Sequence, residues 1–382
     1  MMKNRQFYAT GTAMMLMGSV LFTGCGQKAA SKTAKEEKTT EEETTEEAEP
    51  EVDPATIFPR TKDGKIQSVI DGTYIDEEKA NTRPFAIMIE NTHACTPQYG
   101  LNEAGVIYEC PVEGGITRYM AIWQKPDDFD RIGNIRSCRP YYVWLAAEWN
   151  GVYVHYGQSF QGQAALDTGI VDDLNGLSSL SNLVFYRSSD RKAPHNAYTS
   201  TKGMMDGVEA KSLDMSYDQD QYIHWNYSDP DGDPFVPEGD NVSDVQVLDL
   251  YYYDNDPYFI YDPETGDYTR YEFGEKQIDK ITGEDVTVKN IIIENADNGY
   301  YDDEHYRVKL ALVGANGGEL LTQGKRMPIS WSKEKDSSVT HYYDMYGNLI
   351  TLNPGRTWVC VQEASNCEET KEYATLEEYQ GQ

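Results

Sequence analysis

The sequence predicts an α/β layered N-terminal domain followed by an all-β C-terminal domain, which is either a sandwich or a small barrel. Two observations support this fold class. In the first half of the chain, apolar strand-like runs alternate with helix-like segments, as is typical of layered α/β domains. In the second half, short segments rich in tyrosine, threonine and valine follow one another between turn signals, which is typical of antiparallel β folds.

Residues 1–24 have the features of a lipoprotein signal peptide. Two basic residues among the first five precede an apolar run from Ala13 to Phe22, and small residues then lead directly to Cys25. We expect Cys25 to carry lipid and to become the mature N-terminus, although an ordinary signal peptide with a chance cysteine is the alternative. The apolar run is shorter than the about 20 residues of a transmembrane helix. The sequence therefore predicts a lipid anchor that holds the protein on the outer face of the cytoplasmic membrane.

Residues 25–60 are expected to form a disordered acidic tether. Glutamates crowd the segment from Glu36 to Glu51, and such a charged, weakly apolar chain cannot bury enough surface to fold. Like charges repel, so the tether should be extended. The whole chain has a formal net charge of −31. This charge argues against nucleic acid as a partner, because phosphate contacts drive that binding.

The α/β domain is predicted over residues 61–228. A helix is expected to begin at Pro140, because proline is favoured at the first helical position. The predicted strands of this half are Phe85–Ile89, Val106–Tyr108, Tyr119–Trp123 and Val152–His155, and the predicted helices are Tyr141–Trp149, Ser159–Asp167 and Lys202–Ala210.

A linker rich in proline, glycine and aspartate over residues 229–245 leads to a β-rich domain over residues 246–370. The predicted strands of this half are Val247–Tyr253, Tyr258–Tyr261, Asp267–Phe273, Val286–Glu294, Tyr306–Val313, His341–Tyr343 and Trp358–Val361. Glycine-bearing turns at 264–267 and 345–348 separate several of them.

Short motifs follow one another in a fixed order along both halves. They are Arg83-Pro84, Glu109, Glu113–Arg118, Gly133–Tyr141, His155–Gly157, Pro194–Asn196, Tyr261-Asp262, Tyr268–Arg270, Asn290, Gly324-Lys325, Trp331–Lys333, Tyr343-Asp344 and Asn353–Trp358. In these motifs the chain resembles the YerB-type lipoproteins, a family catalogued as domain of unknown function 3048. The resemblance covers roughly residues 66–365. Asn134 replaces the family's usual proline and Cys138 its usual small residue. The resemblance implies a lipoprotein with N- and C-terminal conserved domains, and it implies no particular reaction.

Arginines gather between residues 113 and 141 of this acidic chain. Arg136 and Arg139 lie just ahead of the helix predicted to begin at Pro140. A helix N-terminus already carries partial positive charge, so further cations there are unfavourable unless an anion shares the site. Arg118 follows a Gly-Gly pair that lets backbone approach a ligand closely. Since arginine suits bidentate recognition of phosphate and carboxylate groups, we expect these three arginines to bind an anion.

Other polar residues could join the arginine cluster. The full predicted ligand-binding set is Arg118, Arg136, Arg139, His155, Ser159, Arg191, His195 and Asn196. A phosphate, pyrophosphate or uronate group of an anionic cell-envelope polymer or glycan would suit it. The alternative is that each arginine pairs with a nearby carboxylate, for which Glu90, Glu109 and Glu113 are candidates.

Two other functions stay open at this stage: a cell-envelope hydrolase or phosphotransferase that uses the same cluster, and a protein-interaction module without a pocket. A serine-hydrolase triad could be sought in His155 and Ser159, with Asp172 or Asp173 as its third member. The sequence around Ser159 lacks the nucleophile-elbow pattern that such enzymes use. Glu90 and Glu109 could form an acid/base pair for glycoside cleavage. We therefore assign no catalytic residues. The histidines show no paired ligand spacing and the cysteines no Cys-x-x-Cys, so we predict neither a metal site nor a cofactor.

Two further residue groups have open interpretations. Five cysteines remain after Cys25, and Cys360–Cys367 is the most plausible bridge among them because it would span a short loop. Tyr251–Tyr253, Trp331 and Trp358 could form a sugar-stacking surface, or they could simply pack in the β-rich half. The oligomeric state is not predicted.

Overall fold

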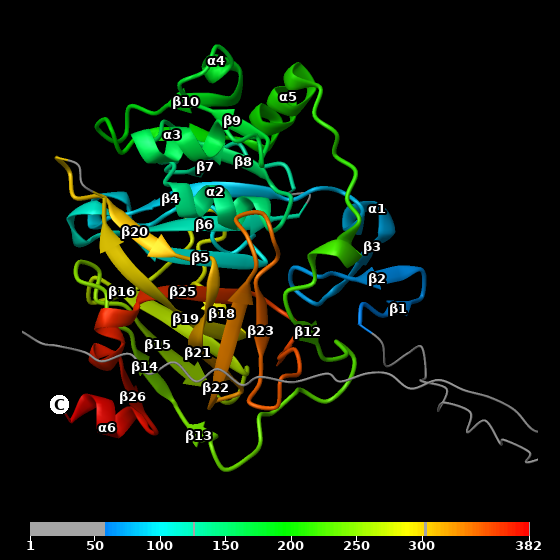
Figure 1. The fold of residues 1–382 in the computed structure, drawn as a ribbon, viewed down its shortest axis with the longest axis vertical. Helices are drawn as coiled ribbons and strands as arrows, with labels where there is room; N and C mark the ends of the chain where they lie inside the picture. The colour runs from blue at the N-terminus through cyan, green and yellow to red at the C-terminus, as the bar shows by residue number, and fades with distance from the viewer. Residues whose placement is uncertain (1–57, 125–126, 302–303, 382) are drawn as a thin grey trace, which may run out of the picture. The chain divides into compact units, whose positions relative to one another are not determined.

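The computed structural model describes residues 58–124, 127–301 and 304–381 (Figure 1). The predicted signal peptide, Cys25 and residues 25–57 of the predicted tether lie outside these ranges. The described fold consists mostly of strands, with few and short helices. Among its helices, none has both the length and the apolar character needed to cross a membrane.

One large sheet runs through both halves of the chain. Strand β25, from the second half, pairs in parallel with β5, from the first half, so that Cys360 lies opposite Glu109. From one edge to the other the strands are β13 (Ser243–Asp244), β22 (Lys325–Lys333), β21 (Gly314–Thr322), β19 (Asn290–Tyr300), β25 (Thr357–Glu363), β5 (Val106–Pro111), β6 (Thr117–Trp123), β4 (Phe85–Asn91), β8 (Val152–His155) and β9 (Asp173–Asn175), with β20 (Val308–Ala311) beside β19 and β23 (His341–Tyr343) beside β22. The two predicted halves therefore share one sheet and one compact unit.

A second sheet of six strands packs on one face of the large sheet. Its strands are β17 (Glu275–Lys276), β16 (Asp267–Glu272), β15 (Tyr258–Asp262), β14 (Val247–Asp249) and β26 (Lys371–Tyr373), with β18 (Thr287–Val288) paired to β16. Phe259 and Tyr268 of this sheet share a buried apolar cluster with Trp358 and Ile291 of the large sheet. The second half of the chain is thus built from two stacked sheets, whose side chains meet in a common core.

Smaller elements complete the described structure. The short sheets are formed by β1 (Thr61–Lys62), β2 (Lys65–Gln67) and β3 (Tyr74–Asp76), by β10 (Phe185–Arg187), β11 (Ala197–Thr199) and β7 (Ile132–Gly133), and by β12 (Asn226–Tyr227) and β24 (Thr351–Leu352). The helices are α1 (Glu77–Ala80), α2 (Pro140–Ala147), α3 (Phe160–Leu166), α4 (Ser181–Val184), α5 (Thr201–Lys211) and α6 (Leu376–Gln380), with 3₁₀ turns η2 (His93–Cys95), η3 (Glu113–Gly115), η4 (Gln219–Tyr222) and η5 (Ala364–Glu369).

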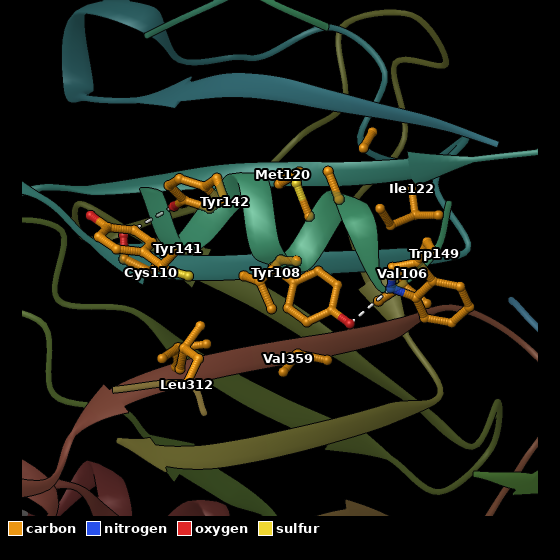
Figure 2. Packing of buried hydrophobic residues seen from close by; sticks show 14 of the residues in the cluster. Val106, Tyr108, Cys110, Met120, Ile122, Tyr141, Tyr142, Trp149, Leu312 and Val359 are labelled. Atoms are coloured by element: carbon orange, nitrogen blue, oxygen red, sulfur yellow. Dashed lines mark hydrogen bonds between the residues drawn. The ribbon is translucent and has the colours of Figure 1, made fainter. Parts of the chain in front are cut away.

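Helix α2 covers the other face of the large sheet. It begins at Pro140, as predicted, with Arg139 at its N-cap position. Figure 2 shows Tyr142 of this helix near Cys110 of β5, and Tyr108 of β5 between the helix and Val359 of β25. Burial of these large side chains removes apolar surface of both halves from water at about 25 cal/mol per Å². The core, like the sheet, is therefore shared between the halves.

Several local expectations differ from the structure. The two long strands β21 and β22 were not predicted, because glycines in β21 and Pro328 in β22 are poor strand signals. At Gly318 of β21 a Cβ atom would lie 2.3 Å from the carbonyl oxygen of Ile293 in the neighbouring strand β19, so a residue with a side chain would force these two strands apart. The Cys360–Cys367 bridge, the most plausible pairing from the sequence, does not form in the described structure: both cysteines are free, Cys360 buried and Cys367 exposed. The α/β layering of the first half stays a prediction.

Candidate functional site

Two cross-strand neighbours form the base of the arginine cluster. Glu90 near the end of β4 lies directly opposite Arg118 near the start of β6, so both side chains leave the same face of the sheet. Both residues are buried. The Nη1 atom of Arg118 donates to the carbonyl oxygen of Ser137 at 2.9 Å, and its Nε atom has no hydrogen-bond partner. Among the residues that the structure describes, no carboxylate forms an ion pair with Arg118.

The three predicted arginines do come together. Burial, followed by the neighbouring guanidinium groups of Arg139 and Arg136, lowers the pKa of Arg118 to about 10. Such a shift means that the positive charge of Arg118 is destabilised by its surroundings. A negatively charged group placed beside it would reverse that effect.

The other two arginines have carboxylate partners, as the alternative interpretation expected. Arg139 donates from Nε to Glu113 Oε1 at 2.6 Å and from Nη2 to Oε2 at 2.5 Å, a bidentate pair. Arg136 places its Nε atom 3.3 Å from Glu90 Oε1. Arg118 is thus the member of the cluster that forms no ion pair in the described structure, and the nearby carboxylate of Glu113 offsets its charge only in part.

His155 and Ser159 are both engaged locally. His155 is fully buried, with Nδ1 2.9 Å from the carbonyl oxygen of Gly157 and Nε2 3.1 Å from Asp173 Oδ2. The Ser159 hydroxyl accepts a hydrogen bond from the backbone N–H of Gly162 and so caps α3. Each side chain therefore has a structural role that explains its position.

The loop before β11 supplies the remaining predicted residues. Arg191 donates to Asn134 Oδ1 at 2.5 Å and to the carbonyl oxygen of Cys95 at 2.8 Å, which fixes two loops to each other. Asn196 bonds to Arg187 and Ser188 in the adjacent hairpin.

His195 reaches the base of the arginine cluster. Its Nδ1 atom lies 2.8 Å from Glu90 Oε1 and 3.5 Å from Cys95 Sγ. Burial and then Glu90 raise the pKa of the Cys95 thiol to about 12, so by itself this cysteine is protonated and a poor nucleophile. Sequence reasoning missed Cys95, because it lies 100 positions before His195 in the chain and only folding brings the two side chains together.

Glu109 is not available for the glycoside chemistry considered above. It is fully buried between the two sheets, where Oε1 accepts from Thr117 at 2.7 Å and Oε2 pairs with Arg270 at 2.8 Å. Trp358 also donates to Oε2 at 3.1 Å. Glu109 is thus a structural carboxylate.

A cleft of about 480 Å³ opens next to Glu113. Three tyrosines on its walls are mostly exposed: Tyr253 at 79%, Tyr300 at 62% and Tyr306 at 73%. Its lining residues are Pro111, Val112, Glu113, Gly114, Gly115, Tyr251, Tyr252, Tyr253, Tyr300, His305, Tyr306, Val308, Gln362, Glu363 and Asn366.

Glycine shapes one wall of this cleft. Gly115 has φ +77°, and a Cβ atom there would lie 2.5 Å from the ring of Tyr253. The ring can therefore approach the η3 backbone this closely only because residue 115 has no side chain. Trp331 and Trp358, for which the sequence left sugar stacking and packing open, are buried in the core, so packing is the correct interpretation for these two residues.

Comparison with known proteins places the chain in a family. Residues 71–216 match the N-terminal domain, and residues 248–359 the C-terminal domain, of the family described as protein of unknown function (DUF3048). The chain belongs to this DUF3048 family. The family predicted from the sequence motifs is thereby confirmed.

The chain is similar to YerB of Bacillus subtilis both in sequence and in structure. The protein named "Putative lipoprotein YerB" from strain 168 is 29% identical over 301 residues, which cover 77% of this chain and 86% of that protein. The crystal structure of YerB protein from Bacillus subtilis matches with a TM-score of 0.68 at 24% identity, over 81% of this chain and all of that one. The first name indicates a lipoprotein, and the second likeness shows the fold alone.

Proposed function

We propose that the protein is a lipid-anchored lipoprotein that binds a sugar-bearing cell-envelope ligand in the tyrosine cleft beside Glu113. In this proposal Cys25 carries the lipid on the outer face of the cytoplasmic membrane, and acidic groups of the ligand are directed to the arginine cluster. The observation that carries the proposal is the gathering of Tyr253, Tyr300 and Tyr306, each more than half exposed, around one cleft.

The chemistry of the cleft suits a sugar. An aromatic ring offers a flat apolar face with a polar hydroxyl at its edge, which matches the C–H face and hydroxyl rim of a pyranose. Gln362, Glu363 and Asn366 on another wall can donate to or accept from ring hydroxyls. Small-molecule pockets measure about 300–1,000 Å³. The cleft is therefore large enough for a short glycan segment.

The arginine cluster adds a preference for acidic groups. Glu113 lines the cleft and also holds Arg139, so a uronate or phosphate of the ligand can compete with Glu113 for that guanidinium. Arg118, which is without an acidic partner in the described structure, adds positive charge behind the pair. We infer that acidic sugars bind more tightly than neutral ones of the same size.

The test is calorimetric titration of the full chain in detergent with neutral, uronate-bearing and phosphorylated envelope oligosaccharides. Tyr253→Ala should weaken binding of every ligand tenfold or more, and Arg139→Gln should weaken only the acidic ones. Tyr346→Ala is the matched control, since Tyr346 is 80% exposed and is not among the cleft residues. Absence of binding, or equal losses in the Tyr253 and Tyr346 variants, contradicts the proposal. Products released during titration would favour the hydrolase alternative.

A further inference from the structure

Three potential metal ligands converge behind the arginine cluster. A carboxylate oxygen of Glu90, the sulfur of Cys95 and a ring nitrogen of His195 all lie within 4.8 Å of one another. They come from the end of β4, from turn η2 and from the loop before β11. No other such group of three or more histidine, cysteine and acidic residues occurs in the described ranges.

The carboxylate of Glu90 and the thiol of Cys95 both approach the same ring nitrogen of His195. Nδ1 of His195 lies 2.8 Å from Glu90 Oε1 and 3.5 Å from Cys95 Sγ. With a proton on Nδ1, the ring donates to Glu90 and the thiol can also turn to that carboxylate; without it, the thiol can donate to Nδ1 but the bond from the ring to Glu90 is lost. A cation between the three atoms would interact favourably with all of them.

The second oxygen of Glu90 is an independent sign of a missing partner. Glu90 is 1% exposed, and its buried Oε2 atom has no hydrogen-bond partner. Buried carboxylate oxygens are nearly always paired, so an unpaired one requires an explanation. Oε1 is held by Arg136 and His195, which leaves Oε2 available to a ligand.

The surrounding residues hold the three ligands in place. Arg191 donates to the Cys95 carbonyl oxygen and to Asn134 Oδ1, and Asn134 in turn donates to the His195 carbonyl oxygen at 2.5 Å. Such outer contacts fix the orientation of metal ligands. The His195 side chain is 32% exposed, so the cluster is accessible from solvent on that side.

We propose that Glu90, Cys95 and His195 form a zinc site. Sulfur, imidazole nitrogen and carboxylate oxygen are the donors that Zn²⁺ prefers, whereas Ca²⁺ and Mg²⁺ prefer oxygen alone. Three protein ligands leave the fourth tetrahedral position open, on the accessible side of His195, to water or to another donor. Binding releases the thiol proton, and any proton on Nδ1, to solvent. The thiolate and the carboxylate together balance the charge of the ion.

The test uses the full chain in detergent, freed of metal by a chelator and titrated with Co²⁺ and then Zn²⁺. We expect one equivalent of Co²⁺ to give a thiolate-to-metal charge-transfer band in the near ultraviolet, and Zn²⁺ to remove it. Cys95→Ser should abolish the band, and His195→Gln should weaken Co²⁺ affinity at least tenfold. Cys367→Ser, at an exposed cysteine elsewhere, should change neither.

The outcomes separate a site from adventitious binding. Absence of the band in the wild-type chain overturns the proposal, as does its persistence in Cys95→Ser or its loss in Cys367→Ser. Should Cys95→Ser fail to fold, the His195→Gln variant decides, because its position is partly exposed and Cys95 stays intact. An unchanged Co²⁺ affinity in that variant would overturn the proposal. Failure here leaves the tyrosine cleft untouched, because sugar binding is measured without added metal.

Discussion

Two buried arginines occupy opposite electrostatic situations. Arg270 lies fully buried between the sheets, with Nη2 2.8 Å from Glu109 Oε2, Nη1 3.0 Å from Glu272 Oε2 and its guanidinium 4.5 Å from the Trp358 ring centroid. Arg118, nearly as buried, donates to one backbone carbonyl and has no ion pair in the described structure. Burial alone therefore does not mark a functional arginine. The mismatch between a buried charge and its surroundings is the more informative sign.

The largest effect is expected for Arg270→Met. Removing this cation leaves the carboxylates of Glu109 and Glu272 buried without their partner, and breaking a buried ion pair from one side costs about 3–5 kcal/mol. Urea unfolding of the variant should show a loss of this size in the free energy of unfolding. A loss below about 1 kcal/mol would mean that the network contributes little and would remove the contrast with Arg118.

Two buried carboxylates show a similar contrast, which should appear in the pH dependence of stability: one is paired with a cation, and the other accepts from a tyrosine hydroxyl. Glu148 is paired with Lys333 at 2.5 Å, and that cation is the main cause holding its pKa below the usual range against burial. Glu294 accepts from Tyr342 at 2.5 Å, and burial raises its pKa to about 7. A raised carboxyl pKa means that the unfolded chain ionises first, so stability is present at low pH and falls between about pH 4.5 and 7.

Glu294→Gln should abolish this fall. The difference in unfolding free energy between wild type and variant is expected to change by about 3 kcal/mol from pH 5 to pH 8, with the wild type losing stability as the pH rises. Urea unfolding at both pH values measures it. The same difference at both pH values would show that Glu294 titrates alike in the folded and unfolded chains.

The smallest effect is expected for Arg118→Met. This change removes a buried cation that has no ion pair in the described structure and keeps most of the side-chain volume, so the free energy of unfolding should stay within about 1 kcal/mol of wild type or increase. Urea unfolding beside the Arg270→Met variant provides the direct comparison. A loss as large as that of Arg270→Met would show that Arg118 is a structural residue after all.

The sequence predicted individual strands and helices better than it predicted which strands pair in the sheets. Apolar runs such as Phe85–Ile89 and the proline at position 140 identified β4 and α2, because burial and capping depend on local sequence. The pairing of β25 with β5 could not be predicted, since it depends on contacts between residues far apart in the chain. β21 was missed because its strand geometry is imposed by its neighbours and contradicts its glycine content.

The candidate site shows the same limit. The motif around Arg136 and Arg139 predicted that the arginines gather, and they do. Motif reasoning could not tell which of them is paired with an acid, because each arginine that has a carboxylate partner finds it far away in sequence: Arg139 pairs with Glu113 and Arg136 with Glu90. The cleft depends on Tyr300 and Tyr306, which only folding brings beside Tyr253.

The β5–β25 pairing also constrains how the chain reaches its native state. Glu109 and Cys360 are neighbours in the sheet but about 250 residues apart in sequence, and contacts of such high order slow folding. Before β25 (Thr357–Glu363) is in place, the backbone donors and acceptors of β5 that will pair with it form an open sheet edge, and such edges can pair with other chains. A chain that emerges N-terminus first would thus need protection from aggregation until almost its last strand is in place.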